Sequence, residues 1–161
     1  MKSEFYSEEI NNRVSEPYTY INNIDMLVSS DSVRDCEKKS LLVSCLNILS
    51  LSINDEESYK VLKHYCEIYE DEMIIKKLHL KLDTKADTYT SVIKERVKCS
   101  PIALNIKFGE SDWILIIGIH CVGDVSKDIA ICYDMDLNKV FTFNLASLLW
   151  MCNKDTRMIY R

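Results

Sequence analysis

Cysteine and carboxylate side chains stand where the apolar stretches of this chain begin or end. Cys36 follows Asp35 at the start of an apolar helical pattern, "RDCEKKSLLVSCLNIL". Asp112 opens the most hydrophobic stretch, "DWILIIGIHC", and Asp134 closes the apolar run "DIAICYD". A cysteine hydrolase needs a thiolate nucleophile, a base and a third group that orients the base. The positive end of a helix dipole favours the thiolate, so Cys36 is the candidate nucleophile.

Histidine is the usual base for such chemistry, and the chain has three of them. His64 and His79 fall on predicted helices, where a surface or boundary position is their ordinary role. His120 lies eight residues beyond Asp112, about 25 Å away if that strand is extended. A base supplied by one of these histidines therefore depends on how the chain folds.

Composition excludes several other functions. The net charge is −5 and the pI about 5.2, with basic residues interleaved among acids, so nucleic acid is not expected as a partner. Three glycines cannot build a GxGxxG or GxxxxGK[ST] loop, zinc-ligand spacing is poor, and "DMDLN" lacks the Gly and distal Glu of an EF-hand. No cofactor and no metal are therefore expected. No apolar run approaches the roughly 18 residues of a membrane span.

Cysteine usage indicates a reducing, cytoplasmic setting. The seven cysteines are odd in number and form no CxxC pair. The N-terminal stretch is polar and acidic, unlike a signal peptide or a mitochondrial presequence. The cysteines within apolar runs are expected to act as small hydrophobic residues.

The length of 161 residues predicts a polar N-terminal arm over 1–17 and a single domain over 18–161. "YTYINNIDMLV" is either a short strand or a docking segment. Apolar spacing predicts a helix over 33–50, with Asp31 or Ser32 as its cap and Cys36 in its first turn. Two further helices are predicted over 54–82. The first is capped by Asn54 or Asp55, and the second extends as far as Leu82. A fourth helix is predicted in "DTYTSVIKERV".

After Cys99 the pattern changes to that of strands. Strands are predicted in "PIALNIKF", "DWILIIGIHC", "DIAICYD" and "KVFTF". "NLASLLWMC" is then a short helix capped by Asn144, and "TRMIY" is the last strand. Helices followed by an antiparallel meander predict an α+β fold in which N-terminal helices pack on a C-terminal antiparallel sheet.

This order of elements, over roughly residues 30–160, resembles the papain-like fold of the C39-type peptidase family. "DCEKKSLLVSCLNILSLSINDEESYKVL" is similar to the helix that carries the family's nucleophile, and "PIALNIKFGESDWILIIGIHC" to the strands that follow it. The resemblance puts Cys36 at the nucleophile, Asp134 at the orienting acid and Trp113 at the aromatic after the base.

The chain departs from the family at three positions that carry the chemistry. Asp112 stands where the family has its catalytic His. The chain contains no Gln, and Ser30 stands near the place of the oxyanion-hole Gln. Glu37 replaces the Gly after the nucleophile. A carboxylate is a weaker base than imidazole, and its charge disfavours a neighbouring thiolate. Loss of the base costs several orders of magnitude in rate.

The resemblance therefore implies a non-catalytic module, a pseudo-cysteine-peptidase that holds a peptide or a partner protein between its helices and its sheet. One alternative is an active cysteine hydrolase or acyltransferase in which His64 or His120 is an atypical base. Another is an unrelated acidic adaptor, such as a secretion chaperone or an immunity-type inhibitor, for which a homodimer is expected. The residues also have structural explanations: Cys36 as a core residue, Asp112 as a turn cap and Asp134 as the start of a turn.

Overall fold

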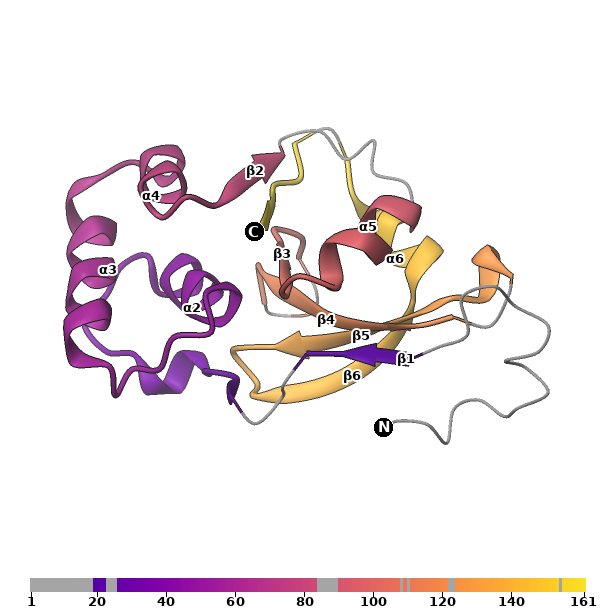
Figure 1. The fold of residues 1–161 in the computed structure, drawn as a ribbon, viewed down its shortest axis with the longest axis horizontal. Helices are drawn as coiled ribbons and strands as arrows, with labels where there is room; N and C mark the ends of the chain where they lie inside the picture. Colours follow the sequence, from indigo (N-terminus) through magenta and orange to yellow (C-terminus); the bar gives the residue numbers. More distant parts are fainter. Residues whose placement is uncertain are drawn as a thin grey trace.

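An antiparallel sheet with helices packed on both of its faces forms the computed structural model of the protein (Figure 1). The structure describes residues 19–22, 26–83, 90–107, 109, 111–121, 124–153 and 155–161. The predicted arm over 1–17 lies outside the described residues. The α+β class predicted from the sequence is confirmed for the part of the chain that is described.

The described strands are all joined in one sheet, and helices or turns connect them along the chain. The strands are β1 (Thr19–Ile21), β2 (Lys81–Asp83), β3 (Ile102–Leu104), β4 (Ile114–His120), β5 (Ile129–Asp134), β6 (Lys139–Asn144) and β7 (Met158–Tyr160). The α-helices are α2 (Lys39–Ile48), α3 (Glu56–Ile68), α4 (Asp71–Lys77), α5 (Thr90–Val97) and α6 (Leu145–Met151), with 3-10 turns η3 (Ser30–Ser32) and η4 (Val125–Lys127). Within the described ranges, no helix has the length and apolar character needed to cross a bilayer.

The sheet has the strand order β2-β7-β3-β4-β5-β6, and each pairing is antiparallel. The predicted meander is confirmed from β3 to β6, and β7 returns to pair with β3. One edge of β4 pairs with β3 over Ile114–Ile116 and with β1 over Gly118–His120. "YTYINNIDMLV" therefore contains a strand, which resolves the alternative left open by the sequence.

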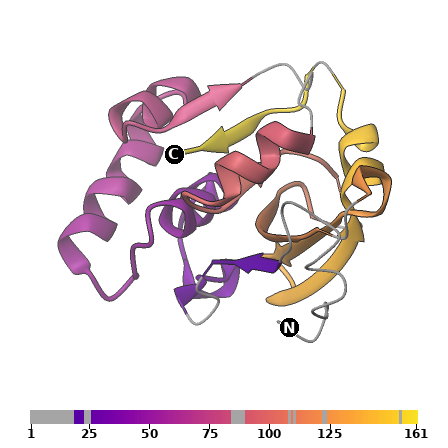
Figure 2. The ribbon, with the colours of Figure 1, turned by 45° about the vertical axis from the view of Figure 1, so that its right-hand side comes forward.

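The two faces of the sheet bury different helices. Helices α2, α3 and α4 gather at the left in Figure 1, and Figure 2 shows α5 and α6 on the other side of the sheet. The alternation along β4 and β5 explains this division, because successive side chains point to opposite faces. Leu115, Ile117, Ile131 and Tyr133 pack with α2–α4, whereas Ile114, Ile116, Ala130 and Cys132 pack with α5 and α6.

The helix that follows Cys36 starts later than the sequence pattern predicts. Helix α2 begins at Lys39, so the prediction that Cys36 lies in its first turn is wrong. Residues Ser30–Ser32 form a 3-10 turn instead of a helix cap. Asp35 then adopts a φ of 55°, a left-handed conformation that interrupts a right-handed helix. Cys36 therefore lies in the connection before α2.

The predicted extension of the second helix to Leu82 is also wrong. Helix α4 ends at Lys77, and His79 takes a φ of 59°. Leu82 lies in β2, where it pairs with Ile159 of β7. Two predicted caps are confirmed. Asp55 accepts a hydrogen bond from the Ser58 amide at 3.5 Å, and Asn144 accepts one from the Ser147 amide at 2.8 Å.

Gly118 allows β1 to lie against β4. A Cβ atom on this residue would collide with the carbonyl oxygen of Tyr20, and it would lie 3.0 Å from the Cα of Ile21. The Asn22 amide donates to the Ile117 carbonyl at 2.8 Å beside this point. The close approach of β1 therefore requires glycine at position 118.

We expect Gly118→Ala to lower the free energy of unfolding by about 1–3 kcal/mol, because a methyl group is forced against backbone. Urea denaturation measures this loss, and amide hydrogen exchange shows whether β1 has separated from β4. Gly109→Ala is the comparison: a Cβ there meets nothing within 4 Å, but the φ of 63° strains it, so this variant should lose stability while the protection of β1 stays unchanged. Unchanged protection of β1 in Gly118→Ala would contradict the expectation.

Candidate functional site

A pocket of about 210 Å³ lies where the start of α2 meets the residues that lead into β4. Its lining combines four segments that are distant in sequence. These are Glu37–Leu41 at the start of α2, Asp71 at the start of α4, Asp112 with Trp113, and Arg157 before β7. The pocket therefore sits between the helices and the sheet, and it contains Asp112 and Trp113, two of the residues singled out from the sequence.

Asp71 joins the segments around this pocket. Its Oδ1 lies 2.8 Å from Lys38 Nζ, and its Oδ2 accepts a hydrogen bond from Arg157 Nη1 at 2.8 Å. Burial raises the pKa of Asp71, but the hydrogen bonds from Lys38 and Arg157 outweigh burial, so its pKa is lowered. The same hydrogen bond with Asp71 is the main cause of a raised pKa for Lys38. One carboxylate thus links α2, α4 and the segment before β7.

Trp113 and Arg157 form the sheet side of the pocket. Trp113 is buried in the core that α2–α4 share with the sheet. The guanidinium carbon of Arg157 lies 5.2 Å from the centre of its ring, within the range of a cation–π contact. Arg157 Nε also donates to Asn105 Oδ1 at 3.4 Å. These contacts position Arg157 between Trp113 and Asp71.

Asp112 is exposed, and its backbone is better restrained than its side chain. Its carbonyl oxygen accepts a hydrogen bond from Asn105 Nδ2 at 3.0 Å. Its carboxylate makes no hydrogen bond or ion pair with the described residues. Asp112 therefore lines the pocket with a carboxylate that has no partner among the described residues.

Cys36 is half-buried and packs against the core on the helix side of the sheet. The pocket lining starts at the next residue, Glu37. The structure therefore brings the chain around Cys36 to Asp112 and Trp113, but the thiol itself is not part of the lining. Cys36 precedes the first residue of α2 by three positions.

Asp134 and Ser30 lie together at the turn between β5 and β6. Ser111 Oγ donates to both carboxylate oxygens of buried Asp134, at 2.8 and 2.9 Å, and the amides of Asp136 and Leu137 donate to Oδ1 at 3.0 and 3.2 Å. Buried Ser30 donates from Oγ to Asp136 Oδ1 at 2.6 Å. Neither residue lines the pocket. The contacts of Asp134 match the turn role that the sequence left open.

The three histidines all lie away from the pocket lining. His120 is buried, and its Nδ1 lies 2.7 Å from Thr19 Oγ1 at the far end of β4. His64 is exposed on α3, and His79 is exposed just after α4. No imidazole therefore lines the pocket beside Asp112 and Trp113.

Sequence reasoning missed Lys38, Asp71 and Arg157. Asp71 carries a weak signal, since an acidic residue in the first turn of a helix is favoured by the helix dipole. Nothing in the spacing indicates that its carboxylate reaches two cations from distant segments. These three residues come together only in the folded chain, where α2, α4 and the segment before β7 surround one pocket.

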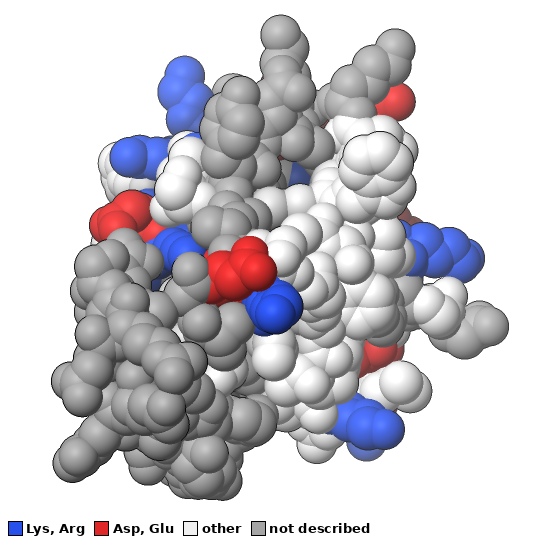
Figure 3. Space-filling model, turned by 90° about the vertical axis from the view of Figure 1, so that its right-hand side faces the viewer, with Lys and Arg blue, Asp and Glu red and all other residues white. Residues whose placement is uncertain are grey.

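The opposite end of the molecule has a different surface. In Figure 3, uncharged atoms occupy the centre of that face, with Lys, Arg, Asp and Glu side chains of described residues separated around it. No cluster of basic side chains is seen there among the described residues.

No family model, curated protein or solved structure matches this chain. Its function is therefore inferred from the pocket.

Asp71→Asn should lower the free energy of unfolding by about 1 kcal/mol near pH 7, because it breaks two partly exposed ion pairs. The folded pKa of Asp71 is below its unfolded value of about 3.9, so its contribution is complete above that pH and is lost as pH falls through the folded pKa. Urea denaturation of both proteins from pH 7 to pH 3 should show the difference shrinking. Glu72→Gln, on the same turn but exposed, is the control, and an equal effect would contradict a specific role for Asp71.

Proposed function

We propose that this protein is a non-catalytic module that binds a peptide or a segment of a partner protein at the pocket between α2 and β4. The observation that supports it most directly is the meeting of residues 37–41 with Asp112 and Trp113 in one pocket. This is the arrangement that a papain-like, C39-like scaffold implies for the nucleophile helix and the base position. The papain-like relationship is part of this proposal.

The chemistry of the pocket favours binding over hydrolysis. A cysteine hydrolase needs a base that removes the thiol proton and returns it to the leaving group. In the proposed alignment the base is replaced by Asp112, which is exposed, and Asp134 is engaged with Ser111 and the turn amides. Among the described residues, none in the lining carries an imidazole. A substrate held here would meet no group suited to proton transfer at neutral pH.

The same lining suits a polypeptide ligand. It offers open carboxylates at Glu37 and Asp112 and a cation at Lys39, while Lys38 and Arg157 are held by Asp71. These polar groups can fix the orientation of a short peptide segment, while the buried ring of Trp113 supplies the apolar side of the pocket.

The hydrolase alternative makes a different prediction for Cys36. If the protein is non-catalytic, iodoacetamide should alkylate Cys36 at neutral pH no faster than free cysteine, because no base activates the thiol. Mass spectrometry of labelled peptides measures the rate at each site, with exposed Cys99 as the internal control. Faster labelling of Cys36 than of free cysteine would favour an active hydrolase.

Binding can be tested by selecting peptides from a phage-displayed random library on the immobilised full chain. Selected peptides should lose at least about tenfold in affinity for Asp112→Lys, because the open carboxylate of the pocket is reversed in charge. Asp31→Lys is the matched control, an exposed aspartate on η3 outside the lining. Recovery of no binding peptides, or equal binding by both variants, would contradict the proposal.

A further inference from the structure

A second pocket, of about 400 Å³, lies where β3 ends and β7 begins. It is larger than the pocket beside Trp113, which holds about 210 Å³, and its volume falls within the range of small-molecule sites. The two pockets share no lining residue, so a ligand bound here is separate from the proposed peptide. The second lining runs along the end of β3 and from the end of α6 towards β7, and it consists of residues 105–107, Met151, Asn153, Asp155 and Thr156.

Hydrogen bonds hold the backbone on both sides of this pocket. The Asn105 amide donates to the Arg157 carbonyl oxygen at 2.9 Å, and Asn105 Oδ1 accepts from Arg157 Nε at 3.4 Å. Between α6 and β7, the Asn153 amide donates to Thr156 Oγ1 at 2.9 Å, and the Asp155 amide donates to Asn153 Oδ1 at 2.8 Å. The site is therefore largely formed before a ligand binds, which lowers the entropic cost of binding.

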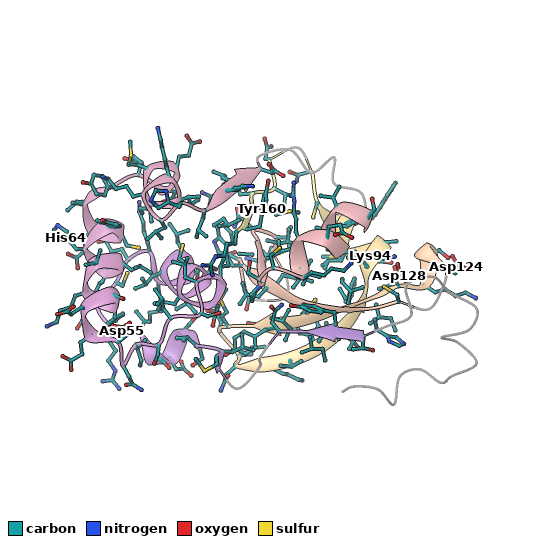
Figure 4. The ribbon with its side chains drawn as sticks, in the orientation of Figure 1. Asp55, His64, Lys94, Asp124, Asp128 and Tyr160 are labelled. Atoms are coloured by element: carbon teal, nitrogen blue, oxygen red, sulfur yellow. The ribbon has the colours of Figure 1, made fainter. Side chains whose placement is uncertain are left out.

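Two opposite charges line this pocket without pairing. Lys107 and Asp155 are exposed, and neither charged group forms an ion pair or a hydrogen bond within the described part of the chain. An ion pair requires an approach to about 4 Å, so the two groups are farther apart than that. Lys94 and Asp128 behave differently, since they lie side by side in Figure 4 with Nζ 2.7 Å from Oδ2. The space between Lys107 and Asp155 therefore suits a ligand that carries one charge of each sign.

Neutral side chains add a donor and an apolar surface to these charges. Asn153 uses its Oδ1 for the Asp155 amide, and its Nδ2 has no partner among the described residues, so it is an open donor. Met151 is 42% exposed at the end of α6, and Ile106 is buried behind the lining. The pocket thus offers a cation and an amide for a carboxylate, a carboxylate for an ammonium group, and a thioether for an aliphatic side chain.

We propose that this pocket binds a small zwitterion of the amino-acid type. Lys107 and Asn153 take its carboxylate, Asp155 takes its ammonium group, and Met151 contacts its aliphatic side chain. Hydrogen bonds between charged groups are stronger than those between neutral groups, so both ends of such a ligand gain. A phosphate-like anion fits less well, because it meets the carboxylate of Asp155. A metal ion fits less well too, since no group of three metal-ligating side chains occurs in the described ranges.

The affinity follows from the exposure of the two charges. Water screens exposed ion pairs, so each contact strengthens binding by about fivefold and the dissociation constant is in the millimolar range. An NMR titration of the ¹⁵N-labelled full chain with L-leucine measures such weak binding residue by residue. The amide signals of Asn153, Asp155 and Thr156 should shift and saturate. Those of residues 38–41, in the pocket of the proposed peptide, should stay unchanged.

Two analogues of leucine test the two charges separately. Leucinamide lacks the carboxylate and N-acetylleucine lacks the ammonium group, so each should bind about fivefold more weakly than leucine. Lys107→Gln should weaken leucine binding by a similar factor and abolish the preference for leucine over leucinamide. Asp155→Asn should instead abolish the preference for leucine over N-acetylleucine. Each variant thus reports on one charge of the ligand, as in a double-mutant cycle.

Lys139→Gln, an exposed lysine on β6 outside the lining, is the matched control and should bind leucine as the wild type does. Far-UV circular dichroism should be unchanged in all three variants, because the altered side chains are exposed. Absence of shifts at residues 153–156 with leucine at tens of millimolar would overturn the proposal. So would equal binding of leucine and its analogues, or variants that keep both preferences. The peptide selection described above reads the other pocket, so its outcome leaves this test unaffected.

Discussion

The bridge from Lys38 through Asp71 to Arg157 is the interaction on which the arrangement of the pocket depends. It connects the start of α2, the start of α4 and the segment before β7, and it lies at the boundary between helices and sheet. Its three side chains are 31 to 34% exposed, so the bridge adds about 1 kcal/mol to the apolar packing that holds these segments together. The position of α2 relative to Asp112 and Trp113 follows from this bridge and from the shared apolar core.

The burial of β4 on both faces is the second constraint on the arrangement of the pocket. Its side chains alternate between the core under α2–α4 and the core under α5 and α6. A register shift between Ile116 and Gly118 changes which residues face each core, and Gly118 then leaves room for β1. Asp112 marks the point at which this buried strand emerges at the pocket. Its acidic side chain is tolerated there because it is exposed.

The pocket near Trp113 is small and largely polar. Within about 210 Å³ it gathers the carboxylates of Glu37 and Asp112 and the ammonium group of Lys39 near the buried ring of Trp113. The proposed function depends on these polar groups, because a few well-placed polar groups fix the orientation of a bound ligand.

Local patterns in the sequence predicted most of the elements. Alternation located β3 to β6, helical spacing located α3 and α6, and side-chain chemistry identified Asp55 and Asn144 as caps. Those features depend on neighbours within a few residues, so they can be read without the fold. The predictions for Cys36 and Leu82 were wrong because backbone conformation at Asp35 and pairing of β2 with β7 override helical spacing.

The sequence by itself determined the α+β class, the order of the main elements and the absence of a His at position 112. Only the tertiary structure decided which residues share a site. It placed Asp134 and Ser30 at a turn, and His120 beside Thr19. It brought Lys38, Asp71 and Arg157 to the pocket instead. The reason is physical: a site forms from side chains that are close in space, and an ion pair between residues 86 positions apart, such as Asp71 and Arg157, leaves no local pattern in the chain.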